Sequence, residues 1–216
     1  MIETILPATV MAAESIGLLD ETAEAAYPEE AALVSTATAR RRAEFAAARA
    51  CGRTALARLG VPPGPIPRAP GGGPRWPIGV LGSITHCAGY RAAVTGRVGV
   101  VRAIGIDAEP HRPLRAGLLD VIASPAERAH LAALRVAEPA VCWDRLLFSA
   151  KESVYKAWFP RTGRWLDFAD AAIAFTPGTD RFNARTRVPA PPDLARLSGR
   201  WLVGDGIAVT AIAQTG

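Results

Sequence analysis

Lysine is almost absent from this sequence of 216 residues. Of its 25 basic residues only Lys151 and Lys156 are lysines, and both lie in the segment Phe148–Lys156. A lysine ammonium is a compact charge that can follow a phosphate oxygen, whereas arginine carries a broad planar fork. Because arginine replaces lysine everywhere else, two lysines around Glu152 favour phosphate chemistry. The alternative is a solvated helix face with a Glu152–Lys156 pair that contributes only about 0.2–0.5 kcal/mol.

Cysteines and long apolar runs are also scarce. The three cysteines, Cys51, Cys87 and Cys142, are odd in number and form no C-x-x-C pair. They exclude a disulfide framework or a cysteine zinc site and indicate reduced thiols in the cytoplasm. No apolar run reaches the roughly 18 residues of a membrane span, and no basic segment precedes an apolar stretch at Met1, so we expect no signal peptide.

The net charge of +5 and the pI near 9.6 suggest an anionic partner. The arginines are scattered, and the sequence contains no zinc-finger, RNP or homeodomain pattern, so we expect no nucleic acid. An anionic cofactor or an acidic protein surface is the better match. With 50% apolar and 21% charged residues, the composition is that of an ordinary globular protein.

Residues 40–59 are predicted to form a helix, since an apolar stripe ends at Gly60 and prolines follow. Arg41, Arg49 and Arg53 fall on or near one face of that helix, which is either a solvated edge or a binding surface. Residues 62–77 are rich in proline and glycine and predict a loop, which contains Arg68.

The rest of the chain predicts an α+β fold. Ser124 to Glu127 is a capping box that starts a helix, and a second helix is expected over 139–158, ending before Pro160. Strands are predicted over residues 90–95 and 98–107, around the turn Gly96-Arg97, and over 172–175, 181–188, 200–203 and 207–213. This order suggests two α+β halves, residues 1–103 and 104–216.

The segment Ile104–Glu109 contains two acidic residues that are two positions apart. Because residues two apart face the same side of a strand, Asp107 and Glu109 are expected to lie together. Like charges that close repel, so one is protonated or a cation lies between them. Mg²⁺ prefers such oxygen ligands, together with water and phosphate. The alternative is a strand end with two solvated acids.

Three segments together resemble a known family. Gly105–Glu109 and Phe148–Lys156 resemble the G-[IV]-D-x-E and [FW]-S-x-K-E-[SA]-x-x-K motifs of the 4′-phosphopantetheinyl transferase superfamily. Pro74–Pro77 and Gly82–Cys87 resemble the W-P and G-S-[ILM]-[ST]-H segment of its larger, pseudo-dimeric branch, which includes actinobacterial enzymes and the activators of siderophore and surfactin synthetases. The resemblance covers roughly residues 40–168.

This resemblance implies two similar α/β halves related by a pseudo-twofold axis, with coenzyme A in the cleft between them. The implied reaction moves the 4′-phosphopantetheine group from coenzyme A to a serine of an apo acyl or peptidyl carrier protein. Mg²⁺ or Mn²⁺ is required, and adenosine 3′,5′-bisphosphate is released. Residues 1–103 would contact coenzyme A, and residues 104–216 would carry the metal site and the catalytic helix.

The resemblance also assigns roles to residues. Asp107, Glu109 and Glu152 would hold the metal, or Glu152 would instead accept the serine proton. Lys151 and Lys156 would supply positive charge to the phosphates. Contacts to coenzyme A are implied for Arg41, Arg49, Arg68, Thr85, His86, Asp107, Glu152 and Lys156, where Arg68 stands in place of the lysine of many relatives. Arg53 fits a structural surface role equally well, and His111, Glu127 and His130 receive no role.

Two other functions stay open at this point. The first is a Mg²⁺-dependent hydrolase of coenzyme A or another nucleotide pyrophosphate, and the second is a non-catalytic module that binds coenzyme A or a carrier protein. Carrier proteins present an acidic helix, which a basic enzyme complements. Since two halves in one chain supply both walls of the cleft, we expect a monomer.

Overall fold

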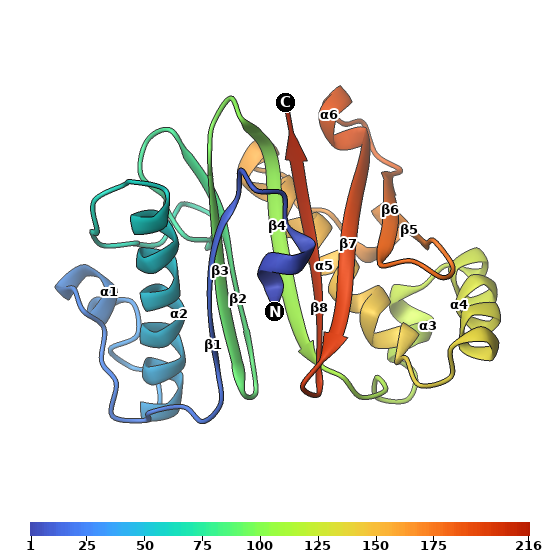
Figure 1. Cartoon of the computed structure of the whole chain (residues 1–216), viewed down its shortest axis with the longest axis horizontal. Helices are drawn as coiled ribbons and strands as arrows, with labels where there is room; N and C mark the ends of the chain where they lie inside the picture. The colour runs from blue at the N-terminus through green and yellow to red at the C-terminus, as the bar shows by residue number, and fades with distance from the viewer.

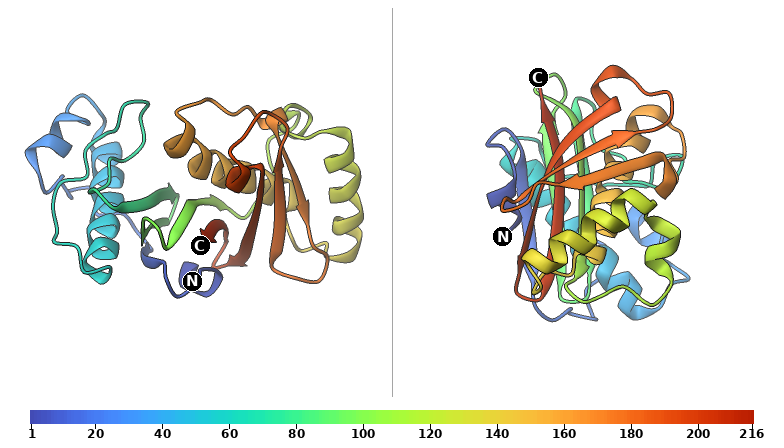
Figure 2. Two further views of the ribbon diagram at one scale, coloured as in Figure 1. Left: turned by 90° about the horizontal axis from the view of Figure 1, so that it is seen from above. Right: turned by 90° about the vertical axis from the view of Figure 1, so that its right-hand side faces the viewer.

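The computed structural model describes residues 1–216 and has the predicted α+β architecture, with two antiparallel sheets side by side. Figure 1 shows the helices α1 and α2 at one end and α3 and α4 at the other, and the view from above in Figure 2 shows the same elongated arrangement. No helix combines the length and the apolar character that crossing a membrane requires.

The elements follow one another in mixed order along the chain. They are η1 (Ile2–Ile5), β1 (Met11–Ile16), α1 (Pro28–Ala32), α2 (Ala39–Arg58), β2 (Val80–Cys87), β3 (Tyr90–Arg97), β4 (Val101–Pro110), α3 (Leu118–Ile122), α4 (Pro125–Ala137), α5 (Trp143–Thr162), η2 (Phe168–Asp170), β5 (Ala171–Phe175), β6 (Arg181–Thr186), α6 (Pro192–Ala195), β7 (Arg196–Gly204) and β8 (Ile207–Thr215).

The sheets have the strand orders β1-β3-β2 and β4-β8-β7-β6-β5. Helix α2 packs against β1 and β3, and α5 packs against β4 and β8. The strands predicted on either side of Gly96-Arg97 are present, but they do not pair with each other. The second begins at Val101 and joins the other sheet by pairing with β8. Seven of the ten residues of β4 are buried, because Ile104 and Ile106 pack in one apolar core while Ala103 packs in the other.

The two sheets meet where β2 lies beside β4. There, side-chain hydroxyls take the place of a backbone ladder: the Ile106 N–H donates to Ser83 Oγ (3.1 Å) and the Ala108 N–H donates to Thr85 Oγ1 (2.9 Å). Strand β4 therefore belongs to the second sheet through backbone bonds and is held to the first by two hydroxyls. It also spans the predicted boundary between residues 103 and 104, and the division into two halves stays a prediction.

Two helix predictions are confirmed and one is corrected. Helix α2 begins one residue before the predicted start, with Thr38 as its N-cap, and the Ser124–Glu127 capping box starts α4. Helix α5 begins at Trp143 rather than near residue 139, and it does not end before Pro160 but runs on to Thr162. A proline removes only one N–H donor, and the last turn is closed by the Gly163 N–H, which donates to the Phe159 carbonyl at 2.8 Å.

Candidate active site

Asp107 lies near the end of β4 and is only 5% exposed. Its Oδ1 accepts from the Lys156 ammonium at 2.7 Å and, more weakly, from the Thr85 hydroxyl at 3.4 Å. Its other oxygen, Oδ2, is buried and has no hydrogen-bond partner in the protein. A buried carboxylate oxygen without a partner is costly unless a further group completes it.

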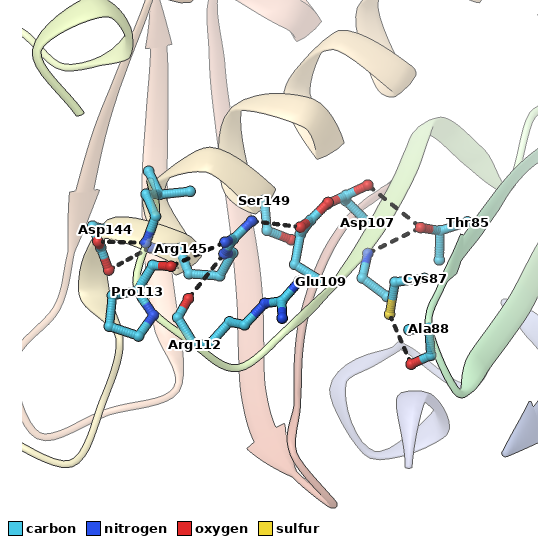
Figure 3. Close-up of polar contacts among 12 residues, drawn as sticks. Thr85, Cys87, Ala88, Asp107, Glu109, Arg112, Pro113, Asp144, Arg145 and Ser149 are labelled. Atoms are coloured by element: carbon cyan, nitrogen blue, oxygen red, sulfur yellow. Dashed lines mark hydrogen bonds and ion pairs between the residues drawn. The ribbon is translucent and has the colours of Figure 1, made fainter. Parts of the chain in front are cut away.

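Glu109 lies two residues further along the same strand, as the alternation predicts. Its Oε2 accepts from Arg145 Nη1 at 2.8 Å, which is the contact at the centre of Figure 3. Burial, and next the negative charge of Asp107, raise the pKa of Glu109, and the Arg145 guanidinium opposes that rise. The two acids are therefore close enough to interact, but each is paired with a different cation.

Helix α5 supplies Glu152 and Lys156, which lie one turn apart. Burial raises the pKa of Glu152, and the charges of Asp107 and Glu109 add to the effect. The partly buried Glu152 carboxylate forms neither a salt bridge nor a side-chain hydrogen bond, so among the three predicted metal-binding acids it alone has no cationic partner within 4 Å. It is available either to hold a cation or to accept a proton.

Lys151 lies elsewhere, although it belongs to the same motif. Its buried ammonium donates to Glu127 (3.1 Å) and to the Phe168 carbonyl (2.7 Å). Burial lowers the pKa of Lys151, and the neighbouring Glu127 carboxylate opposes that shift. Glu127, which received no role from the sequence, also accepts from the Ile173 and Ser124 N–H groups. The structure therefore brings Lys156, but not Lys151, to the Asp107 carboxylate.

The carboxylate oxygens of these acids are ligands of the kind that a hard divalent cation prefers. One oxygen of Asp107 has no partner in the protein, and after burial the charges of the neighbouring acids contribute to the raised pKa values of Glu109 and Glu152. Mg²⁺ needs one or two such carboxylates and completes its shell with water and phosphate oxygens. No group of three His, Cys, Asp or Glu side chains, the set of Asp107, Glu109 and Glu152 included, is arranged so that it could hold a metal ion. A cation at this site would therefore depend on water and phosphate oxygens for much of its shell.

Basic side chains of the first half gather on α2, the following loop and β2. Arg49 is buried, its guanidinium lies over the Phe45 ring at 4.3 Å, and its Nε donates to the Ile66 carbonyl at 2.9 Å. Burial, together with the charges of Arg53, Arg68 and Arg41, lowers the pKa of Arg49 to about 10, although the Glu30 carboxylate opposes the shift. Such crowding of positive charge favours an anionic ligand.

Arg41 and His86 come together from α2 and β2, because Arg41 Nη1 contacts His86 Nε2. Burial, and then the charge of Arg41, lower the pKa of His86. Thr85, the neighbouring residue, is buried, and its hydroxyl serves the Ala108 N–H and Asp107 rather than a cavity. Arg53 forms a salt bridge with the buried Glu30 at 2.8 Å.

A cavity of about 710 Å³ lies between the predicted loop, β2 and α5. Its walls include the glycines of the loop, Trp76, Glu152, Tyr155, Lys156 and Phe159. Gly71 is required there, since a Cβ would lie 2.4 Å from the Phe159 ring and its φ is +91°. A second cavity of about 120 Å³ shares Glu152 and Tyr155 and is otherwise lined largely by residues 165–168. The larger volume is within the range of small-molecule sites.

Arg145 is a residue of this site that the sequence interpretation missed. It lies seven residues before Glu152, close to two helical turns, and therefore on the same side of α5. That spacing was readable from the sequence, but no motif marks it.

Comparisons with known proteins agree on one family. The description "4'-phosphopantetheinyl transferase N-terminal domain" matches residues 29–96, and "4'-phosphopantetheinyl transferase superfamily" matches residues 103–200. The chain is 50% identical to 4′-phosphopantetheinyl transferase Svp of Streptomyces mobaraensis, over 90% of this chain and 80% of the relative. It is 48% identical to PptT of Mycobacterium tuberculosis over 98% and 97% of the two chains, and 44% identical to Npt of Nocardia iowensis over 99% of each.

Proposed function

The chain belongs to the 4′-phosphopantetheinyl transferase superfamily, and from this premise we propose that it catalyses a Mg²⁺-dependent transfer at Asp107, Glu152 and Lys156. The family moves the 4′-phosphopantetheine group of coenzyme A onto carrier proteins, and this chain is a transferase of that kind. One observation supports the residue assignment most: Asp107 is held by Lys156 at 2.7 Å, while its second oxygen is buried without a partner.

The proposed cation is held by Asp107 together with Glu109 and Glu152. When bound, Mg²⁺ or Mn²⁺ would neutralise pyrophosphate charge and act as a Lewis acid at the phosphorus to be attacked. The unpartnered Asp107 oxygen and the unpaired Glu152 carboxylate are the groups that such an ion would complete. Glu109 is held in addition by Arg145.

Lys156 is proposed to bind the phosphates. Its side chain is 27% exposed and lies on the wall of the larger cavity, so its ammonium can reach a ligand there. Most catalysis in phosphoryl transfer consists of positioning and charge neutralisation, to which a mobile point charge contributes directly. The Lys151 ammonium already has a carboxylate and a carbonyl as partners, which supports a role in holding α5 instead.

Glu152 is proposed to receive the proton of the attacking serine hydroxyl, directly or as part of the cation shell. Burial raises the pKa of Glu152 toward neutral pH. A general base is most effective when its pKa lies near the pH at which the enzyme works. Glu152 lines both cavities, so it lies where substrate enters.

Coenzyme A is proposed to bind with its nucleotide phosphates toward Arg41, Arg49, Arg68 and His86. Burial lowers the pKa values of Arg49 and His86 most, and neighbouring positive charges, Arg41 among them, add to both shifts; an anionic ligand would offset that added positive charge. The acceptor is proposed to be an apo acyl or peptidyl carrier protein, whose acidic helix complements the net charge of +5.

Mass spectrometry of an apo carrier protein tests the proposal. The carrier, coenzyme A and Mg²⁺ are incubated with the enzyme, and the carrier should gain one phosphopantetheine group. Asp107→Asn, and wild type without divalent metal, should give no product. Loss of coenzyme A without an acceptor would instead indicate a hydrolase, and binding without either reaction would indicate a non-catalytic module.

A further inference from the structure

Arg145 uses all three nitrogens of its guanidinium group on one short segment. Nη1 donates to Glu109 Oε2 at 2.8 Å, Nε to the Arg112 carbonyl at 3.0 Å and Nη2 to the Pro113 carbonyl at 3.2 Å. Figure 3 shows these contacts converging from the first turn of α5 on the end of β4. The Arg145 side chain is only 13% exposed, and its contact with Glu109 is partly buried, whereas its two contacts with carbonyls lie at the surface.

Other residues at the start of α5 hold the same segment without touching an acid of the site. Asp144 Oδ2 accepts from the Leu114 N–H at 2.9 Å, and His111 Nε2 accepts from the Cys142 N–H at 2.9 Å. The segment after β4 is therefore anchored several times. Only Arg145 also reaches a carboxylate that we assign to the cation.

We propose that Arg145 is a positioning residue that orients Glu109 for the divalent cation; this inference rests on the proposed cation site. The two carbonyl contacts fix the guanidinium, and the fixed guanidinium holds one oxygen of Glu109. The other carboxylate oxygen forms no hydrogen bond or salt bridge within the protein and stays available to the cation. A planar fork performs this task better than a flexible ammonium, because its donors keep a fixed geometry.

Two simpler roles for Arg145 predict a different effect of its loss on metal affinity. If Arg145 only anchors the loop, its loss lowers stability and leaves metal affinity unchanged. If it acts only as a positive charge, its loss removes repulsion and tightens metal binding. A partner that orients a carboxylate ligand has the reverse effect, since its loss typically weakens metal binding by about 10- to 100-fold.

The test is a calorimetric titration of metal-free protein with Mn²⁺, without carrier protein. Arg145→Gln should bind Mn²⁺ at least about tenfold more weakly than wild type, and Arg145→Lys should lie between them. Asp144→Asn is the matched control, because it weakens the anchor at Leu114 but does not touch Glu109. It should lower the melting temperature while keeping wild-type Mn²⁺ affinity.

Transfer activity gives a second readout. Raising Mn²⁺ should restore the turnover of Arg145→Gln toward wild type, which would not happen if the variant were only misfolded. Unchanged or tighter Mn²⁺ binding by Arg145→Gln, or no rescue at saturating metal, would overturn the inference. If wild type itself bound no Mn²⁺, the proposed cation site would fail, and this inference with it.

Discussion

Glu30 is fully buried, and its carboxylate accepts from Arg53 Nη1 at 2.8 and 2.9 Å and from the Ile66 N–H at 2.8 Å. This contact joins α1 to α2 and to the loop that forms one wall of the larger cavity. The Ile66 carbonyl accepts from Arg49, so both backbone polar groups of Ile66 are held, one by α1 and the other by α2. The pair of Glu30 and Arg53 thus positions a residue predicted to contact coenzyme A.

Glu30→Gln should therefore lower the free energy of unfolding strongly. Removing one partner of a buried ion pair leaves the other charge uncompensated and costs about 3–5 kcal/mol. Urea denaturation measures the loss. Arg40→Gln is the control, since Arg40 pairs with Glu44 at the surface and exposed pairs contribute about 0–1 kcal/mol. Equal effects of the two substitutions would show that burial of Glu30 adds nothing.

Lys156→Arg should reduce the turnover of carrier-protein modification by about 100-fold or more, the usual effect of losing one group that stabilises the transition state. Arginine keeps the charge, but its broad fork does not fit the place of a point cation beside Asp107. Activity should be measured beside thermal melting, with Asp107→Asn as the inactive reference. Near-wild-type turnover would show that Lys156 has no catalytic role and is only a cation on the helix surface.

Thr85→Val should weaken Mn²⁺ binding, because the Thr85 hydroxyl donates to Asp107 while it accepts from the Ala108 N–H. Valine keeps the shape and loses both bonds. Ser83→Ala is the matched control, since Ser83 accepts from the Ile106 N–H in the same way without touching Asp107. Each substitution leaves one buried N–H unpaired, at a cost of about 1–3 kcal/mol in stability. Equal Mn²⁺ affinities of the two variants would show that Thr85 does not orient Asp107 for the cation.

The pH dependence of stability and of coenzyme A binding should report on His86. Burial and the charge of Arg41 lower its pKa below the ordinary 6.5, so the unfolded chain binds this proton more readily. Its contribution to stability is complete above pH 6.5 and is lost as the pH falls toward the lowered pKa. A phosphate beside the ring would favour the imidazolium, so binding should take up protons just below pH 6.5.

Calorimetry in two buffers of different ionisation enthalpy measures this proton uptake. His86→Gln has no titrating ring, so it should lose both the uptake and the acid destabilisation. The same uptake in His86→Gln would assign the proton to another group.

Local features of the chain were predictable because neighbouring residues determine them. The apolar stripe and the proline-rich stop define α2, the capping box defines the start of α4, and strand alternation places Asp107 and Glu109 together. Both lysines were predicted to bind the phosphates, although their spacing argues against a shared role. Five residues along a helix are a rotation of about 140° beyond a full turn, so Lys151 and Lys156 face different sides of α5.

Long-range partners were not predictable. Lys151 pairs with Glu127 of another helix, and Arg145 with Glu109 of a strand, and no local pattern encodes either choice. The pairing of β4 with β8 is equally hidden, because a strand's periodicity gives its exposed faces but not its neighbour. The continuation of α5 past Pro160 depends on contacts of the final turn that the proline rule does not weigh.

The pairing of β4 with β8 also means that the five-stranded sheet can form only late in synthesis. Its backbone partner β8, Ile207–Thr215, leaves the ribosome about a hundred residues after it. Until then β4 has an open edge, and the apolar residues it shares with the first sheet lack part of their cover. Exposed edges and apolar surface of this kind are what chaperones bind and what aggregates grow from. Premature termination upstream of β8 would therefore leave the five-stranded sheet without its second strand and the apolar core between the sheets without part of its cover.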